Sequence, residues 1–134
     1  MAEKILLSIL TPDRRVYEES VEEVVLPGSE GYLGVLPGHA PLLTSLKIGE
    51  ISIRQGSAWR HAFVAWGFAE VLGDRVGVLA DVGELGEKID VERAAKARDR
   101  ANERLMKPVS DVDHERARAA LERAVARMKV ASHK

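Results

Sequence analysis

Four arginines in the last third of the chain are spaced so that they could act in pairs. Arg123 and Arg127 are four residues apart and Arg93 and Arg100 are seven apart, so in helices each pair lies on one face. Guanidinium groups bind phosphate and carboxylate oxygens through charge-assisted, often bidentate hydrogen bonds. Solvated ion pairs are the usual role of arginines in such a charged segment, so the spacing permits an anion-binding face without requiring one.

None of the sequence patterns typical of enzymes is complete in this chain. Gly28 and Gly34 are six residues apart, one more than the two glycines of a phosphate loop, and Val35-Leu36 stands where the loop requires lysine and serine or threonine. No Gly-x-Ser-x-Gly or His-Glu-x-x-His pattern is present. We therefore expect no catalytic residue.

The sequence gives no sign of a metal site either. The chain contains no cysteine, which excludes disulfides and thiolate zinc sites. His61, His114 and His133 are not spaced along the chain like metal ligands. His39, between Pro37-Gly38 and Ala40-Pro41, is interpreted as a turn residue.

The composition changes abruptly near residue 90 and divides the chain in two. All eleven glycines and four of the five prolines lie before that point, and residues 1–89 carry a net charge of −5. The rest is rich in alanine, arginine, glutamate and lysine, and it carries +4, so the whole chain has −1. We expect a sheet domain over 1–88 and a helical domain over 89–134.

Short apolar stretches separated by turn residues predict an antiparallel β sandwich or barrel in the first part. Turns are indicated by segments such as Thr11-Pro12-Asp13 and Pro27-Gly28-Ser29. Trp59 and Trp66 flank one strand and are interpreted as core or interface residues. The expected strands are Ile5–Leu10, Val21–Leu26, Tyr32–Leu36, Leu42–Leu46, Ile51–Arg54, His61–Val64, Phe68–Leu72 and Val76–Ala80.

After Asp90 the composition favours helix. One helix is expected from about Val91 to Met106, with Asp90 as its N-cap. A second is expected from about His114 to Val130, after a polar connection over 109–113, so the two form an antiparallel hairpin. Narrow apolar stripes follow helical spacing on both helices, and they consist of Ala94, Ala101, Leu105, Ala117, Leu121, Ala124 and Met128.

This hairpin offers little apolar surface for packing. An alanine buries one methyl group, at about 0.8 kcal/mol, whereas ordering a residue costs about 1–2 kcal/mol of backbone entropy. We therefore expect marginal docking, and a hairpin that a ligand or partner can open or re-dock. A ligand that binds one position of the hairpin about 5.5 kcal/mol more tightly than the other shifts the ratio of the two populations from 1:99 to 99:1.

Composition and charge exclude several functional classes. With 134 residues, 46% of them hydrophobic and 31% charged, the chain is typical of a globular protein and not of a disordered one. No apolar run approaches the roughly 18–20 residues of a membrane helix, and the N-terminus does not resemble a secretory signal, so a cytoplasmic location is expected. The basic hairpin has no aromatic residue to stack a base, which favours an acidic protein partner over nucleic acid.

The segment Leu33 to Thr44, LGVLPGHAPLLT, followed by Leu46-Lys47-Ile48-Gly49-Glu50, resembles the signature of the epsilon subunit of bacterial F-type ATP synthase. The opening Ile9-Leu10-Thr11-Pro12-Asp13 and the stretch Gly67-Phe68-Ala69-Glu70-Val71 resemble the same family. The resemblance covers essentially the whole chain. It implies a flattened sandwich of about ten antiparallel strands followed by a C-terminal α-helical hairpin.

The function that the resemblance implies is that of a noncatalytic central-stalk subunit, which couples proton-driven rotation to ATP synthesis. The sheet domain would bind the gamma subunit and the c-ring, with the turn Ser29-Glu30-Gly31 as the c-ring contact, peripheral to the membrane on its cytoplasmic face. The folded hairpin would permit turnover. Extended along gamma, it would turn its basic surface toward an acidic beta segment in the alpha/beta head and inhibit ATP hydrolysis.

A narrower motif, Ile89-Asp90-Val91-Glu92-Arg93-Ala94, resembles the pattern of epsilon subunits that bind ATP, best known among bacilli. The resemblance implies that ATP is a regulatory ligand, is not hydrolysed and holds the hairpin folded, while the part played by magnesium stays open. The implied contacts are Glu84, Ile89, Asp90, Arg93 and Ala94 around the base, with Arg100, Arg123 and Arg127 toward the phosphates.

Other interpretations of the same residues remain open. Asp90 can be an ordinary N-cap, and the arginines can form solvated ion pairs. The alternative for the whole chain is a free-standing β sandwich that binds a ligand or partner, with helices that only pack against it. A stable complex with gamma would distinguish the two. A nucleic-acid adaptor, the third possibility, requires salt-dependent binding to DNA or RNA.

Overall fold

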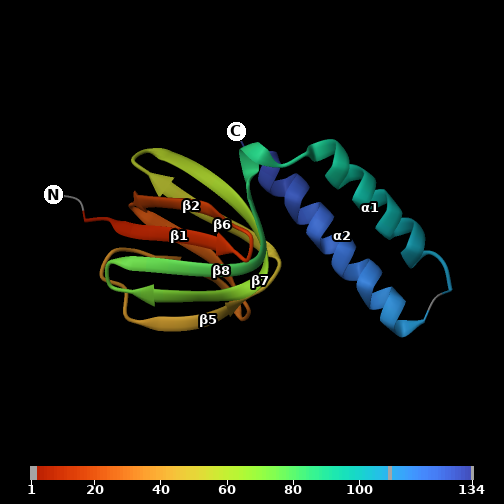
Figure 1. The fold of residues 1–134 in the computed structure, drawn as a ribbon, viewed down its shortest axis with the longest axis horizontal. Helices are drawn as coiled ribbons and strands as arrows, with labels where there is room; N and C mark the ends of the chain where they lie inside the picture. Colours follow the sequence, from red (N-terminus) through yellow and green to blue (C-terminus); the bar gives the residue numbers. More distant parts are fainter. Residues whose placement is uncertain (1–2, 109, 134) are drawn as a thin grey trace.

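The protein consists of a β sandwich and a helical hairpin that projects from one end of it (Figure 1). The structure is a computed structural model, and it describes residues 3–108 and 110–133. A short 3-10 helix, η1 (Gly86–Lys88), joins the last strand to the hairpin. The expected architecture of a sandwich followed by a hairpin is confirmed.

Eight strands form the sandwich in the described part of the chain, two fewer than the resemblance implied. They pair in the order β2-β1-β8-β7-β5-β3-β4, and β6 pairs with both β3 and β7. The pairings are antiparallel except for that of β1 with β8, which is parallel. The strands are β1 (Ile5–Thr11), β2 (Arg14–Val21), β3 (Glu23–Gly28), β4 (Gly31–Val35), β5 (Leu42–Leu46), β6 (Gly49–Gln55), β7 (Ala58–Leu72) and β8 (Arg75–Leu85).

The sequence-based assignment missed β2 because this strand is mostly polar. Only Tyr17 and Val21 are fully buried in it, and its other side chains are exposed or half-buried. It lies at one end of the strand order, and charged side chains are usual on such an edge because they discourage pairing with other chains. The expected strand Val21–Leu26 is present as β3, but its start was placed too early, since Val21 ends β2 and Glu23 begins β3.

Alternating aliphatic side chains fill the sandwich core. On β1, Ile5, Leu7 and Ile9 are at most 1% exposed, whereas Leu6 between them is 41% exposed. This is the period-two pattern of a strand with one buried face. The same alternation buries Ile51 and Ile53 of β6, so the sandwich has a continuous core of large residues.

Two expected strands, His61–Val64 and Phe68–Leu72, are parts of the single strand β7, which bends between them. Residues 58–64 pair with β6 and residues 67–71 pair with β5. At the bend Trp66 and Gly67 have φ angles of 58° and 134°. Trp66 is 46% exposed and Trp59 is 45% exposed, so neither tryptophan belongs to the core.

The hairpin consists of α1 (Val91–Leu105) and α2 (Asp111–Ala131). Asp90 is the N-cap of α1, as predicted, and its Oδ1 accepts a hydrogen bond of 3.1 Å from the backbone N–H of Arg93. The second helix begins earlier than expected because Ser110 caps it by accepting from the N–H of Asp113. The expected connection over 109–113 is therefore wrong from Asp111 onward, and Val109 lies outside the described residues.

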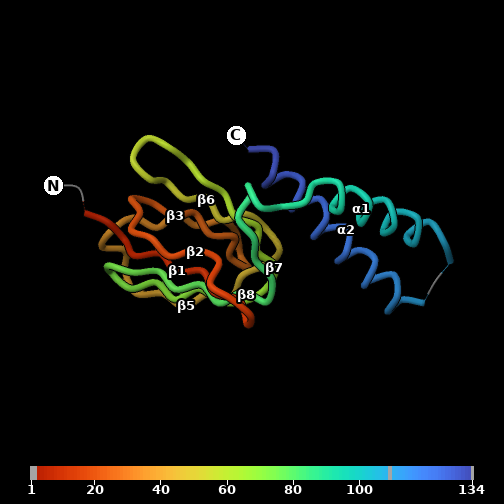
Figure 2. The backbone as a smooth tube through the Cα atoms, turned by 45° about the horizontal axis from the view of Figure 1, so that its top comes forward, coloured from red at the N-terminus to blue at the C-terminus, as the bar shows by residue number. Residues whose placement is uncertain are grey.

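The buried residues of the hairpin are mostly alanines. Ala94, Ala101, Ala117 and Ala124 are each at most 4% exposed, which confirms the alanine part of the predicted stripes. Leu105, Leu121 and Met128 are half-buried. The two helices lie side by side and extend away from the sandwich in both views (Figure 2), so their long contact is with each other.

A small apolar cluster near the end of α2 docks the hairpin on the sandwich. We call it the docking cluster, and its buried members are Phe63 and Ala65 of β7, Ile89, and Val130 of α2. Burying a valine side chain contributes about 1.5–3 kcal/mol. A cluster of this size therefore supplies only a few kcal/mol, in keeping with the marginal docking expected from the sequence.

The bend in β7 yields a stability prediction. A Cβ on Gly67 would lie 2.0 Å from the carbonyl oxygen of Leu79, in addition to the strain of a positive φ. We expect Gly67→Ala to lower the free energy of unfolding by at least about 3 kcal/mol, measured by urea denaturation. Gly77→Ala is the matched control on β8, because a Cβ there meets nothing within 4 Å; a change beyond about 1 kcal/mol is not expected. Equal effects of the two substitutions would contradict this role of Gly67.

Candidate functional site

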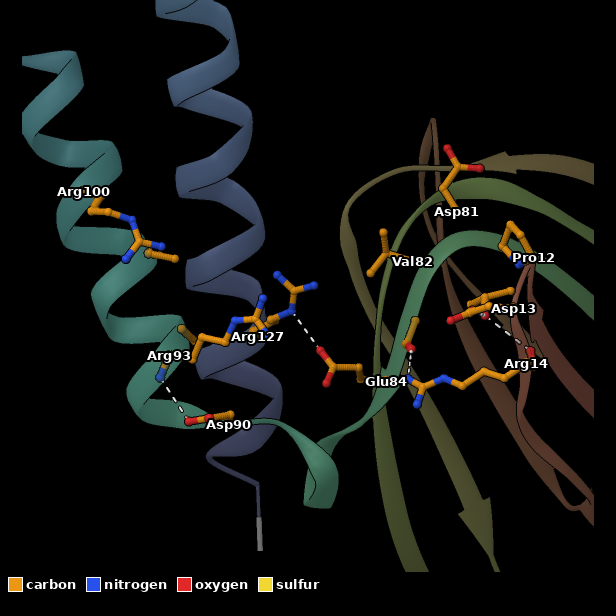
Figure 3. Close-up of a pocket in the computed structure, with 14 residues that line it drawn as sticks. Pro12, Asp13, Arg14, Asp81, Val82, Glu84, Asp90, Arg93, Arg100 and Arg127 are labelled. Atoms are coloured by element: carbon orange, nitrogen blue, oxygen red, sulfur yellow. Dashed lines mark hydrogen bonds and ion pairs between the residues drawn. The ribbon is translucent and has the colours of Figure 1, made fainter.

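A cleft of about 580 Å³ lies between the hairpin and the sandwich (Figure 3). Its sandwich wall is formed by the turn Thr11–Arg14 and by Asp81–Glu84 of β8. Arg127 of α2 and one face of α1 form the opposite wall. A cleft of this size is typical of small-molecule sites. The α1 side consists of Asp90, Arg93, Ala94, Ala97 and Arg100.

The α1 wall follows from helical spacing. Arg93, Ala97 and Arg100 are three to four residues apart and so share one face, which the structure turns toward the sandwich. Arg93 and Arg100 are exposed, and within the described residues their guanidinium groups make no hydrogen bond or ion pair. The alanines between them leave room for a ligand to reach both guanidinium groups.

Arg127 and Glu84 connect the two walls. The Nε of Arg127 donates to Oε1 of Glu84 at 2.9 Å, and both side chains are about one quarter exposed. The Arg127 guanidinium also lies 4.5 Å from the centre of the Phe63 ring, a cation–π contact. Because this arginine is on α2 and this glutamate is on β8, the pair exists only while the hairpin is docked.

Hydrogen bonds hold the sandwich wall in place. Thr11 Oγ1 donates to Asp13 Oδ1 at 2.6 Å, and Arg14 donates to the carbonyl oxygen of Gly83 at 3.0 Å. The hydrogen bond from Thr11 is the main reason why the pKa of Asp13 lies below its ordinary value. Asp13 is therefore ionised at neutral pH, and the turn is a fixed part of the cleft.

The cleft brings together most of the residues that the sequence assigned to ATP. Arg123 does not line it, and Ile89 is buried in the docking cluster. Arg123 is one helical turn closer to the hairpin tip than Arg127, about 6 Å along the axis. The predicted residues that do line the cleft are Glu84, Asp90, Arg93, Ala94, Arg100 and Arg127.

Apart from Glu84, the residues on the sandwich side of the cleft were not predicted from the sequence. Thr11-Pro12-Asp13 was recognised only as a turn, and Asp81 was not assigned any role. Their place opposite α1 depends on how the hairpin docks, which no local pattern specifies. The lining carries four arginines and four carboxylates, so it can bind phosphate oxygens and also accept hydrogen bonds from an amino group.

The turn predicted to contact a c-ring is exposed and well fixed. It joins β3 to β4, with Ser29 and Glu30 exposed. The Ser45 hydroxyl donates to the Ser29 hydroxyl at 2.8 Å, and the Ser29 N–H donates to the carbonyl oxygen of Ser45. Gly31 has a φ of 135°, which glycine adopts easily. The c-ring contact of this turn stays a prediction.

Exposed apolar side chains form a row across four strands of the sandwich. Leu10 of β1 is opposite Leu79 of β8, which is opposite Phe68 of β7. Leu43 of β5 lines the same shallow groove. Leu43, Phe68 and Leu79 are 70%, 58% and 61% exposed. We call these four residues the apolar row, and such a patch is typical of an interaction surface.

A second polar cluster lies where α2 ends. Glu50 of β6, His61 of β7 and His133 meet there, and the two imidazole rings stack with 3.7 Å between their centres. Burial lowers the pKa of His61 below its ordinary value, and His133 adds to this effect while Glu50 opposes it. The sequence gave no sign of the cluster because its members come from three separate segments.

No helix in the described ranges, 3–108 and 110–133, is long and apolar enough to span a membrane.

Two family models together match nearly the whole chain. Residues 4–86 match the beta-sandwich domain of the ATP synthase Delta/Epsilon chain. Residues 87–132 match the long alpha-helix domain of the same chain.

Curated relatives and solved structures agree with these matches. The chain is 48% identical to an ATP synthase epsilon chain of Nitratidesulfovibrio vulgaris (strain DP4), with 97% of each chain covered. It is 50% identical to that of Syntrophobacter fumaroxidans, with 98% of each covered. A chain in the mitochondrial ATP synthase of Euglena gracilis, solved with OSCP, F1 and the c-ring, has a TM-score of 0.82 and 26% identity, over 97% of this chain and 82% of that one.

Proposed function

The chain belongs to the family of ATP synthase epsilon subunits, and from this premise we propose that it is a stalk subunit whose hairpin is a nucleotide-controlled brake. In this proposal bound ATP, which is not hydrolysed, keeps the hairpin docked on the sandwich. Loss of ATP releases the hairpin, which then inhibits ATP hydrolysis by the complex. The subunit itself has no catalytic role.

The arginine-rich cleft between the hairpin and the sandwich is the observation that carries this proposal. A ligand in the cleft contacts both walls, and it loses those contacts when the hairpin leaves. It therefore stabilises the docked form by mass action. At a free concentration of 100 times Kd this stabilisation is about 2.7 kcal/mol, which is similar to the free energy expected from the docking cluster.

The cleft suggests how the nucleotide would lie. Arg93 and Arg100 carry guanidinium groups without partners among the described residues, and Arg127 lies on the same wall of the cleft, so the phosphates would lie among these three. Glu84 and Asp90 can accept hydrogen bonds from the adenine amino group. This arrangement moves Arg93 from the base to the phosphates, and it leaves Arg123 without a contact in the docked form.

The released hairpin has the charge that an inhibitory contact requires. The last 45 residues carry a net charge of +4, and α2 would present part of this charge to an acidic segment of beta in the alpha/beta head. Opposite charges on the two surfaces would speed and orient this encounter.

We propose that the sandwich remains on the stalk in both states. The apolar row would dock on gamma, because three neighbouring strands expose Leu43, Phe68 and Leu79 there, next to the half-buried Leu10. The turn Ser29-Glu30-Gly31 would rest on the c-ring, which places the subunit at the cytoplasmic face of the bacterial membrane as a peripheral component.

The nucleotide site can be tested by calorimetric titration of the tag-free chain with ATP. Arg100→Ala removes a guanidinium group that no other described residue engages, so we expect the affinity for ATP to fall about tenfold or more. Arg104→Ala is the matched control, because Arg104 is exposed on the same helix and does not line the cleft. Equal affinity of the wild type and Arg100→Ala would rule out this site, and a repeat titration with EDTA tests the part played by magnesium.

The stalk assignment can be tested by co-purification with gamma. Leu79→Asp places a charge in the apolar row and should weaken the complex about a hundredfold, because the carboxylate would have to be buried. Val112→Asp is the control, since Val112 is 60% exposed at the hairpin tip and Leu79 is 61% exposed. A complex that survives Leu79→Asp unchanged would exclude the apolar row as the gamma site. Absence of any complex with the wild type would favour a free-standing ligand-binding sandwich.

A further inference from the structure

The end of α2 meets the sandwich at a cluster of metal-binding side chains. Glu50 and His61 lie on neighbouring strands, and His133 follows the last turn of the helix. One donor atom from each residue lies within 4.8 Å of the other two. Two imidazoles and one carboxylate form a ligand set typical of zinc.

The distances between the donor atoms suit a small cation. Glu50 Oε1 lies 2.6 Å from Nε2 of His133 and 3.6 Å from Nδ1 of His61. With bonds of about 2.0–2.1 Å, tetrahedral zinc ligands lie about 3.3 Å apart. The two observed separations fall on either side of that value.

The Glu50 carboxylate is satisfied only in part. Its Oε1 is shielded from solvent and makes no hydrogen bond with the described residues, although Nε2 of His133 lies 2.6 Å away. A buried carboxylate oxygen without a partner is costly. A bound cation would satisfy it, and the nearby cleft of about 290 Å³, which is lined by His61 and His133, provides the entry path.

One ring must turn before both imidazoles can bind the same ion. The rings stack at an interplanar angle of 18°, whereas the nitrogen lone pairs lie in the ring planes. His133 is the ring that can move, because its side chain is 37% exposed and it lies beyond the end of α2. His61 lies within β7 and is 17% exposed, so it would supply the fixed half of the site.

We propose that Glu50, His61 and His133 bind a divalent transition-metal ion, with Zn²⁺ as the representative, and that this ion fastens the end of α2 to the sandwich. Water would complete the coordination. Since two ligands belong to the sandwich and one follows α2, the ion binds the docked hairpin and not the released one. The site lies apart from the nucleotide cleft and shares no lining residue with it, so the ion needs no contact from ATP, although each ligand favours the other because both select the docked hairpin.

The experiment is a competition titration of the tag-free, nucleotide-free chain with Zn²⁺ and a chromophoric chelator. We expect one ion per chain, and affinity at least about tenfold lower in Glu50→Gln and in His133→Gln. His114→Gln is the matched control, since His114 lies on α2 far from the cluster and should bind Zn²⁺ like the wild type. Hydrogen exchange of the last α2 turn should slow with Zn²⁺, by up to about a hundredfold at 100 times Kd.

Three results would overturn the proposal. They are the absence of Zn²⁺ binding by the wild type, undiminished binding by both variants, and unchanged hydrogen exchange at the end of α2 when Zn²⁺ is bound. Circular dichroism of each variant verifies that it is folded. Because no nucleotide is present, failure here would leave the proposed ATP site untouched.

Discussion

Arg127 and Val130, three residues apart near the end of α2, make the charged and apolar contacts that join the hairpin to the sandwich. Arg127 reaches Glu84 on β8, and Val130 packs with Phe63, Ala65 and Ile89. Most of the hairpin extends away from the sandwich (Figure 1) and buries mainly alanine between its helices. Because few side chains hold the hairpin on the sandwich, a ligand that stabilises the docked form by a few kcal/mol can shift the equilibrium between the docked and released forms.

The sandwich supplies the fixed half of this arrangement. Its core of large aliphatic residues is continuous, and the bend at Trp66 and Gly67 lets β7 pair with β6 and then with β5. The turn between β1 and β2 and the end of β8 face α1 across the cleft, and β1, β8, β7 and β5 carry the apolar row. A well-packed base with a loosely attached hairpin fits a subunit that stays on a stalk while one part of it moves.

Local chemistry explains which features the sequence could predict. Asp90 as a cap and the alanine stripes depend on neighbours within one helix, so they were found correctly. β2 was missed because its edge position leaves it mostly polar, and the start of α2 was missed because the cap at Ser110 was not recognised. Arg93, Arg100 and Arg127 could be named from a family motif. The position of Arg123 outside the cleft depends on tertiary packing, and so does the cluster of Glu50, His61 and His133. No spacing along the chain encodes them.

The most direct test of the account is the distance between the hairpin and the sandwich in the isolated subunit. The chain has no cysteine, so Asp74→Cys on the sandwich and Glu103→Cys on α1, both at exposed positions, would carry the only two spin labels for a pulsed electron resonance measurement. With saturating ATP the account predicts one narrow distance distribution, and without ATP it predicts a second population at another distance. One unchanged narrow distribution under both conditions would contradict it.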